Sequence, residues 1–185
     1  MAIVLDLITK ESDKELIIRF QLGDVASFDQ LVARYEKPLL NFLYRFTMDY
    51  QLAEDVFQEA FFTVYKKAQK FDLSKKFSTW LYEIAVNKAV DKLRKKKILV
   101  ALKPEIENIK HDQLNPEENY EKREIQTRLQ KALGFLSEEH RLVLVLKHYQ
   151  GLDYKEIAEI LNCPIGTVKS RIYYALKDLK NHLEK

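Results

Sequence analysis

The sequence contains little of several residue types that usually mark a covalent framework, a turn or a membrane segment. Its 185 residues include one cysteine, Cys163, so neither an internal disulfide nor a cysteine-rich zinc site can form. Only four glycines and four prolines are present, which favours long regular elements joined by few turns. No run approaches the roughly 18 apolar residues of a membrane-spanning helix. The N-terminal segment lacks a basic start with a cleavage site, so we expect a cytoplasmic protein.

Motifs of common enzymes and metal sites are also missing. The histidines are scattered and none has HExxH spacing, and the nucleotide-binding patterns GxxxxGK[ST] and GxGxxG do not occur. The nucleophile motif GxSxG is absent as well. We therefore expect no enzymatic activity, no small-molecule substrate, no metal and no cofactor. The formal net charge is only +3, so the distribution of charge along the chain is more informative than its sum.

Helical periodicity dominates the chain, and no segment alternates as a half-buried strand does. Ser12 is expected to cap the first helix, and Ser27 with Gln30 to form a capping box for the second. Pro38 predicts a kink or a restart within that second helix. The expected helices cover residues 13–22, 27–47, 52–68 and 75–97, then 123–134, 138–149, 154–161 and 166–182.

Residues 98–122 separate the two sets of helices. They carry three lysines and six acidic residues, a local charge of −3, and include Pro104 and Pro116. This composition is typical of a linker. The expected fold class is therefore all-α, with one small helical domain over residues 1–97, the flexible linker, and a second helical domain over residues 123–185.

The segment 151–180 has the spacing of a helix-turn-helix. Ala158 is small where two helices must cross closely, and Asn162 can adopt the left-handed conformation of the turn. Val168, ten residues after Ala158, is a β-branched core residue of the second helix. Asp153, three residues before a glutamate, has the spacing of a cap for the first helix. These coincident positions predict a DNA-binding helix-turn-helix, and the alternative is a plain three-helix bundle with a solvated face.

The second helix of this pair is predicted to have an apolar and a polar face. Residues at helical spacing form the apolar stripe, namely Val168, Ile172, Ala175, Leu176 and Leu179. Backbone N–H groups at its N-terminal end can hold a phosphate, and lysine and serine side chains suit bases or phosphates in a major groove. The DNA-contact candidates on this helix are Gly166, Thr167, Lys169, Ser170, Arg171, Tyr173 and Tyr174.

Residues 75–97 combine aromatic rings with positive charge, since eight of the 23 are lysine or arginine. One predicted face is an apolar stripe made by Tyr82, Val86, Ala89, Val90 and Leu93. The other carries Trp80, Asn87, Lys88, Asp91, Arg94 and Lys95. Asparagine can read a base edge, basic side chains can neutralise phosphates, and rings can stack on unpaired bases. This face has the chemistry for opened DNA. The alternative is packing by Phe77 and Trp80 beside solubility charges at residues 95–97.

Three motifs, in this order and spacing, resemble those of the extracytoplasmic function (ECF) sigma factors, group 4 of the sigma-70 family of bacterial RNA polymerase. Asp55-x-x-Gln58-Glu59 is similar to the helix by which these factors dock on the polymerase. Residues 76–87 resemble their promoter-melting segment, and residues 163–171 resemble their C-terminal helix-turn-helix. The resemblance covers residues 14–97 and 122–182. Tyr174 and Glu83 stand where many members carry a basic residue, so a promoter sequence cannot be transferred.

The resemblance implies a sigma factor that binds core RNA polymerase, directs it to −35 and −10 promoter elements and melts the −10 element. Asp55, Gln58 and Glu59 would meet the clamp helices of the beta-prime subunit, with the beta subunit as a further contact. Promoter DNA and an anti-sigma factor, which in some cases is membrane-bound, are the other implied partners. The −10 set is Phe71, Lys75, Lys76, Phe77, Thr79, Trp80, Asn87, Lys88 and Arg94. The −35 set adds Lys147 and Tyr154 to the seven residues of the last helix.

The linker length agrees with this implication. Promoter elements about 17 bp apart are separated by roughly 58 Å at about 3.4 Å per base pair. A 25-residue chain reaches about 80–90 Å when extended, so residues 98–122 can join domains placed on both elements. The alternative interpretation is a helix-turn-helix regulator without sigma activity, which would bind a palindrome as a dimer. Such a regulator needs neither the Asp55 motif nor the basic aromatic helix. An enzyme or a helical adaptor is a third, less supported interpretation.

Overall fold

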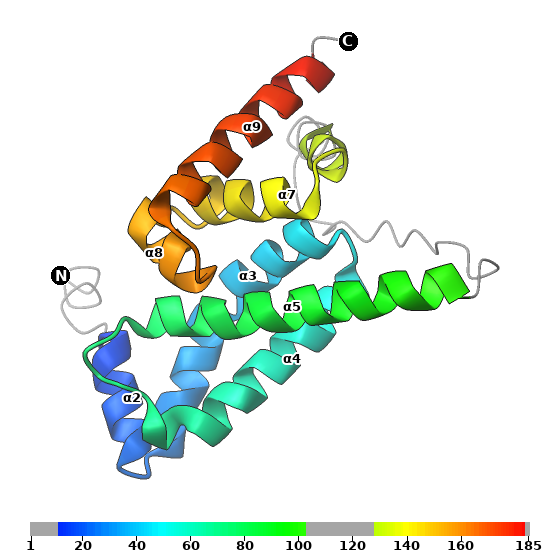
Figure 1. The fold of residues 1–185 in the computed structure, drawn as a ribbon. Coiled ribbons are helices and arrows are strands. Elements are labelled where there is room, and N and C mark those ends of the chain that lie inside the picture. The colour runs from blue at the N-terminus through cyan, green and yellow to red at the C-terminus, as the bar shows by residue number, and fades with distance from the viewer. Residues whose placement is uncertain (1–10, 103–127, 184–185) are drawn as a thin grey trace, which may run out of the picture.

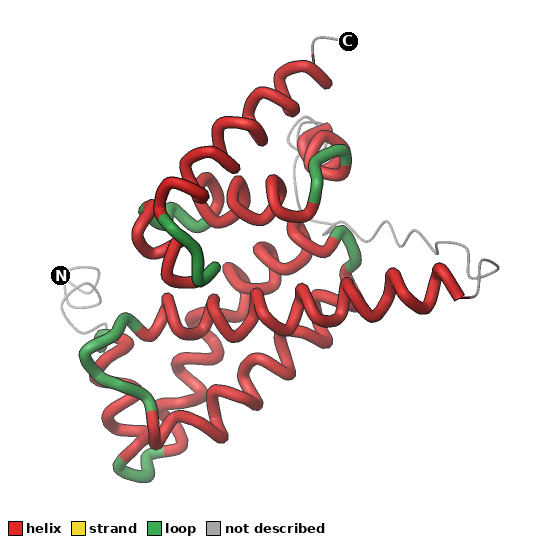
Figure 2. The backbone as a smooth tube through the Cα atoms, in the orientation of Figure 1, coloured by secondary structure: helices red, strands yellow, loops and turns green. Residues whose placement is uncertain are grey.

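The computed structural model describes residues 11–102 and 128–183, and in these two ranges every regular element is a helix (Figures 1 and 2). The expected all-α fold is confirmed. The N-terminal helices are α2 (Asp13–Gln21), α3 (Val25–Thr47), α4 (Tyr50–Lys67), a short 3-10 turn η1 (Ala68–Lys70) and α5 (Phe77–Leu102). Residues 128–134 are helical and precede α7 (Glu138–Leu144), a π-helical turn η2 (Val145–Tyr149), α8 (Tyr154–Ile160) and α9 (Ile165–Leu183).

The start of α3 differs from its sequence prediction. Ser12 does cap α2, with the capping box completed by Glu15. The α3 cap, however, is Asp24, whose side chain accepts from the Ala26 N–H, while Ser27 is buried inside the helix. The Gly23-Asp24 pair thus begins the helix three residues before the predicted box, because an aspartate at the cap already satisfies an orphan donor.

Pro38 does not interrupt α3, which runs unbroken through it. A proline inside a helix removes one backbone hydrogen bond at a cost of about 3 kcal/mol. Fully buried Leu31, Leu39 and Phe42 lie on either side of it, so packing of the apolar face offsets that cost. The sequence predicted either a kink or a restart at Pro38, and the restart is wrong.

Helix α5 is longer than predicted, since it continues through Leu102, five residues into the segment assigned to the linker. Four members of its predicted stripe, Tyr82, Val86, Ala89 and Leu93, are buried against α3 and α4, but Val90 is 43% exposed. The C-terminal end of α5 extends past the other N-terminal helices (Figure 1). The rest of the predicted linker lies outside the described residues.

The helix-turn-helix has the predicted local structure. Asp153 caps α8 in a full capping box with Glu156, and Asn162 takes a left-handed conformation with φ 46°. Ala158 and Val168 are both buried where α8 and α9 cross. One position of the α9 stripe was wrong, because Leu176 is 44% exposed.

The two sets of helices pack against each other. Helix α8 lies on α5, while α7 and η2 lie on α3 (Figure 1). The buried residues of both sets form one continuous apolar core. The sequence left the relative placement of the two sets open, and the structure shows them joined.

Candidate functional site

The predicted polymerase-docking residues form a patch on one exposed face of α4. Asp55, Gln58 and Glu59 are exposed and lie on successive turns of the helix. Lysines of the neighbouring helix α5 approach the two carboxylates: Lys92 Nζ lies 2.9 Å from Glu59 Oε1 and 3.4 Å from Asp55 Oδ2. The Lys92 ammonium holds the pKa of the Glu59 carboxyl below its ordinary value. The patch is therefore anionic but already ordered from within the chain.

The sequence did not predict that two lysines of α5 face this patch. Lys88, predicted to meet −10 DNA, has its Nζ 3.6 Å from Glu59 Oε2 and is only partly exposed. Lys92 was in no predicted set. Its spacing of four residues from Lys88 was the available signal, since residues four apart share a helix face.

A further exposed ring borders the α4 patch. Phe62 is 60% exposed one turn beyond Gln58 and Glu59, and the Lys66 ammonium lies 4.1 Å from its ring centroid. An exposed phenylalanine on the same face adds apolar contact area to a polar patch. The sequence motif did not include it.

The loop before α5 and the first turn of α5 pack their aromatic side chains together. Phe71 and Trp80 have ring centroids 4.6 Å apart, and Phe77 lies 6.1 Å from each. Phe71, Phe77 and Thr79 are at most 8% exposed, so direct DNA contact by these three predicted residues does not fit this conformation. Trp80 is half-buried above them. The rings form the apolar floor that fixes the start of α5.

The remaining −10 candidates lie at the surface. Lys75, Lys76, Asn87 and Arg94 are all exposed along α5 and the loop before it. Arg94 Nη2 lies 3.2 Å from Asp91 Oδ1, and Lys76 Nζ lies 2.8 Å from Glu156 Oε1 of α8. Asn87 stands in mid-helix, where its intrinsic propensity is poor. The arrangement leaves one amide and several cations on a single face.

The helix-turn-helix candidates gather from three elements around one ring. Lys147 of η2 and Lys169 of α9 have their ammonium groups 5.0 and 6.0 Å from the ring centroid of Tyr154 at the start of α8. Lys147 also donates to the Leu152 carbonyl at 3.0 Å. Two ammonium groups beside the Tyr154 ring, at the exposed start of α8, can bind a DNA phosphate.

Other members of the −35 set differ in exposure and in their contacts. Tyr173 and Tyr174 are 64% and 52% exposed and touch edge to face. Gly166 is exposed with open space beside its Cα, and the Ser170 hydroxyl donates to the Thr167 carbonyl at 3.0 Å. Arg171 Nη2 lies 2.9 Å from Glu139 Oε2 of α7, so here it braces the domain rather than facing outward.

Comparison with known proteins identifies both halves. The Sigma-70 region 2 family matches residues 31–98, and the Sigma-70, region 4 family matches residues 126–179. The chain is 34% identical to the RNA polymerase sigma-H factor of Pseudomonas aeruginosa, over 96% of this chain and 97% of that protein. It is 36% identical to the ECF RNA polymerase sigma factor SigW of Bacillus subtilis, over 92% and 96% of the two chains. The chain belongs to the ECF sigma factors of the sigma-70 family.

Solved structures of similar fold agree with this assignment. CnrH in complex with the cytosolic domain of CnrY superposes with a TM-score of 0.73 at 25% identity, covering 94% of this chain and 98% of that one. The sigma factor RpoE of Bartonella quintana, in complex with the anti-sigma factor NepR, gives 0.67 at 24% identity, over 85% and 96%, and so supports the fold alone. This sigma factor acts in transcription initiation. Its region 2 match covers most of α3, all of α4 and most of α5, and its region 4 match covers α7, α8 and most of α9. In the described ranges no helix is long and apolar enough to cross a membrane.

Proposed function

We propose that this sigma factor binds core RNA polymerase through the α4 patch and places region 2 on the −10 element and region 4 on the −35 element. The observation that carries the proposal is the exposed face of Asp55, Gln58 and Glu59 in a chain that also exposes a helix-turn-helix. A regulator acting without sigma activity requires only the second of these surfaces. A compact anionic patch suits a basic helical partner such as the beta-prime clamp, and the beta subunit is a second contact.

Region 2 reads and opens the −10 element in this proposal. Asn87 hydrogen-bonds a base edge, and Lys75, Lys76 and Arg94 neutralise phosphates along the same face. Taking a base out of the stack costs a few kcal/mol, which rings and hydrogen bonds must offset. The half-buried Trp80 is the ring proposed for this role, and Phe71 and Phe77 pack against it. Thr79 is buried beside them in sequence and supports the start of α5.

Region 4 reads the −35 element with the N-terminal half of α9. Lys169 and Ser170 are exposed where a recognition helix meets base edges, and Gly166 with Thr167 offers backbone donors at the helix start. Lys147 and Tyr154 contact phosphates and fix the register. Tyr173 and Tyr174 widen the contact along α9. Arg171 contacts DNA once its ion pair with Glu139 is broken.

Because core polymerase is its proposed partner, we expect the chain in the cytoplasm. Catalysis of RNA synthesis belongs to the polymerase and not to this chain.

An anti-sigma factor is a further proposed partner. Its support is the fold shared with CnrH, whose structure was solved in complex with the cytosolic domain of CnrY. The proposed domain limits remain 1–97 and 123–185, although α5 itself continues to Leu102.

The deciding experiment is run-off transcription with bacterial core polymerase and a library of promoter fragments. The proposal expects promoter-specific transcripts that appear only when the chain and the core enzyme are both present. The regulator alternative expects binding to palindromic DNA as a dimer, without any effect on the specificity of core polymerase. Absence of binding to the core enzyme would refute the proposal.

A further inference from the structure

Helix α2 lies beside the loop that leads into α5 (Figure 1). Its apolar face carries the buried Leu16, Ile17 and Phe20, which attach the helix to α3. The Sigma-70 region 2 match begins at residue 31 and leaves α2 out. Two polar contacts of α2 reach beyond the apolar packing and hold the loop at its two ends.

The first contact lies at the end of α2. Gln21 Nε2 donates to the carbonyl of Ala68 at 2.8 Å and to the carbonyl of Phe71 at 3.4 Å. In return, Gln69 Nε2 donates to the Gln21 carbonyl at 3.0 Å. Ala68 and Phe71 are buried, so leaving their carbonyls without this donor is unfavourable. One glutamine side chain therefore fixes the place where the 3-10 turn ends and the loop begins.

The second contact starts in the first turn of α2. The Tyr35 hydroxyl of α3 donates to the Asp13 carboxylate, and the Tyr35 ring centroid lies 5.6 Å from that of Phe77, the first residue of α5. Arg34 Nη1 lies 2.5 Å from Asp13 Oδ1, so the carboxylate is held from a second side. Burial, with Asp13 beside it, raises the pKa of the Tyr35 hydroxyl above its ordinary value, so the hydroxyl stays protonated as a donor. Tyr35 thus links the start of α2 to the start of α5.

Between these two anchors the loop makes a local turn. The Asp72 side chain accepts from the Ser74 N–H at 2.9 Å, and the Asp72 carbonyl accepts from the Lys75 N–H at 3.0 Å. An aspartate turn of this kind fixes its own shape but not its place on the protein. The place of the turn therefore depends on the two anchors.

Trp80 takes its position from both anchors. Its ring centroid lies 4.6 Å from that of Phe71, whose carbonyl Gln21 holds. It lies 6.1 Å from that of Phe77, against which Tyr35 packs. A ring that accepts an unstacked base must be held close to its working geometry by the groups around it. The two anchors supply that support from outside the DNA-contact set.

We propose that α2 positions the −10-reading surface of region 2 through two positioning residues, Gln21 of α2 itself and Tyr35, which Asp13 of α2 holds. Gln21 acts on Trp80 through Phe71. Tyr35 acts on the same ring through Phe77. The role of this surface in reading DNA rests on the proposed function, whereas the positioning of Trp80 is a property of the chain alone.

Trp80 is the single tryptophan of the chain, so its fluorescence tests the positioning directly. Gln21→Ala and Tyr35→Phe should each shift the emission of the full chain to longer wavelength and raise the acrylamide quenching constant, with unchanged circular dichroism. Gln30→Ala, on an exposed position of α3, and Tyr65→Phe, on an exposed position of α4, make the same chemical changes elsewhere. These two controls should leave emission and quenching unaltered. Wild-type emission and quenching in both Gln21→Ala and Tyr35→Phe would overturn the proposal.

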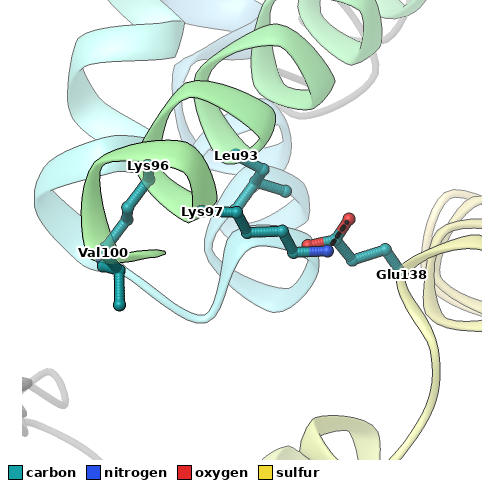
Figure 3. A pocket seen from close by; sticks show the side chains of 5 residues that line it. All are labelled: Leu93, Lys96, Lys97, Val100 and Glu138. Atoms are coloured by element: carbon teal, nitrogen blue, oxygen red, sulfur yellow. Dashed lines mark ion pairs between the residues drawn. The ribbon is translucent and has the colours of Figure 1, made fainter. Parts of the chain in front are cut away.

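The far end of α5 provides a control for general loosening of that helix. There Lys97 Nζ lies 2.9 Å from Glu138 Oε2, beside a pocket of 330 Å³ that Leu93, Lys96 and Val100 also line (Figure 3). Lys97→Met removes this ion pair and touches neither anchor, so Trp80 should fluoresce as in the wild type. A response equal to that of Tyr35→Phe would mean that Trp80 reports any loosening of α5, and would overturn the assignment to α2.

Promoter reading by the holoenzyme supplies the second readout. Gln21→Ala and Tyr35→Phe should each reduce −10 discrimination about two- to ten-fold, the range set by one net hydrogen bond. The apparent affinity for core polymerase should stay unchanged, because neither anchor contacts the α4 patch. A general structural defect would weaken both properties together.

Asn87→Ala, run alongside, separates failure of this proposal from failure of the proposed function. If Asn87→Ala loses −10 discrimination while Gln21→Ala and Tyr35→Phe keep it, the positioning role of α2 is refuted and the proposed function stands. If all three variants keep wild-type discrimination although Trp80 fluorescence responds, the proposed function of the surface fails and α2 still positions Trp80.

Discussion

Lys92 of α5 bridges Glu59 and Asp55 of α4, with its ammonium 2.9 Å from one carboxylate and 3.4 Å from the other. The anionic patch proposed for polymerase binding is thus positioned by the helix that carries the proposed −10 surface. A basic partner that takes these carboxylates competes with Lys92 and with Lys88. The two functional faces of region 2 are therefore coupled through one set of ion pairs.

Replacing Lys92 by methionine should raise the pKa of the Glu59 carboxyl toward its ordinary value. Because that pKa is lowered in the folded state, the pair's stabilisation is present above the unfolded pKa of about 4.3 and is lost as pH falls through the folded value. The half-exposed Glu59 side chain limits the effect to at most about 1 kcal/mol. Carboxyl NMR titration measures the shift, with Lys95→Met as the control. An unmoved Glu59 titration would contradict the bridge.

Asn87→Ala should abolish discrimination within the −10 element and slow open-complex formation, while binding to core polymerase is retained. A lost side-chain contact to a base edge is worth about 1–3 kcal/mol, or about five- to 150-fold in discrimination. Promoter-variant transcription and permanganate footprinting measure this. Asn41→Ala removes the same amide from an exposed position of α3 and should behave as wild type. Equal behaviour of the two variants would show that Asn87 does not read DNA.

Lys169→Ala and Lys147→Ala should weaken −35 binding in different ways. Loss of the phosphate contact of Lys147 should lower affinity for all sequences and reduce the slope of log affinity against log salt by about one. Lys169→Ala should instead reduce the preference for the −35 sequence. Holoenzyme binding to matched and mismatched promoters over a salt series separates the effects. Lys177→Ala, on an exposed later turn of α9, is the control.

Arg141→Met should destabilise the chain by about 2–4 kcal/mol, because it removes the Arg141 donors from the buried carbonyls of Phe46, Leu133 and Leu136. Urea unfolding monitored by circular dichroism measures the loss. Lys131→Met, an exposed position in the preceding helix, should change stability by less than about 0.5 kcal/mol. A loss no larger than that of the control would mean that water replaces Arg141 at these carbonyls.

Local patterns predicted much of this structure because their causes are local. The Asp153 capping box, the left-handed Asn162 and the buried Ala158–Val168 crossing follow from residues within one short segment. The exposure of Asn87 follows from helix period alone.

Features that depend on a distant partner were not predicted. Lys88 points to Glu59 because α4 lies beside α5, and Phe71 is buried because the loop before α5 folds onto Trp80. The bond between Tyr82 and Gln150 joins residues 68 apart in the chain. A one-dimensional period contains no information about such pairs, so the joined arrangement of the two regions came only from the structure.

The π-helical turn η2 gives region 4 a property that concerns insertion and deletion. A π-turn holds one residue more than an α-turn of the same length, so it shifts the angular phase of everything that follows. Here Lys147 points toward Tyr154, while Tyr149 and Gln150 point to Arg45 and Tyr82 of region 2. Removing one residue from 145–149 would leave an α-turn, so the following residues would keep their direction far better than after a deletion from a regular α-helix, which rotates them by about 100°. A single deletion within η2 should therefore disturb the contacts of region 4 with Arg45 and Tyr82 less than a deletion within α7.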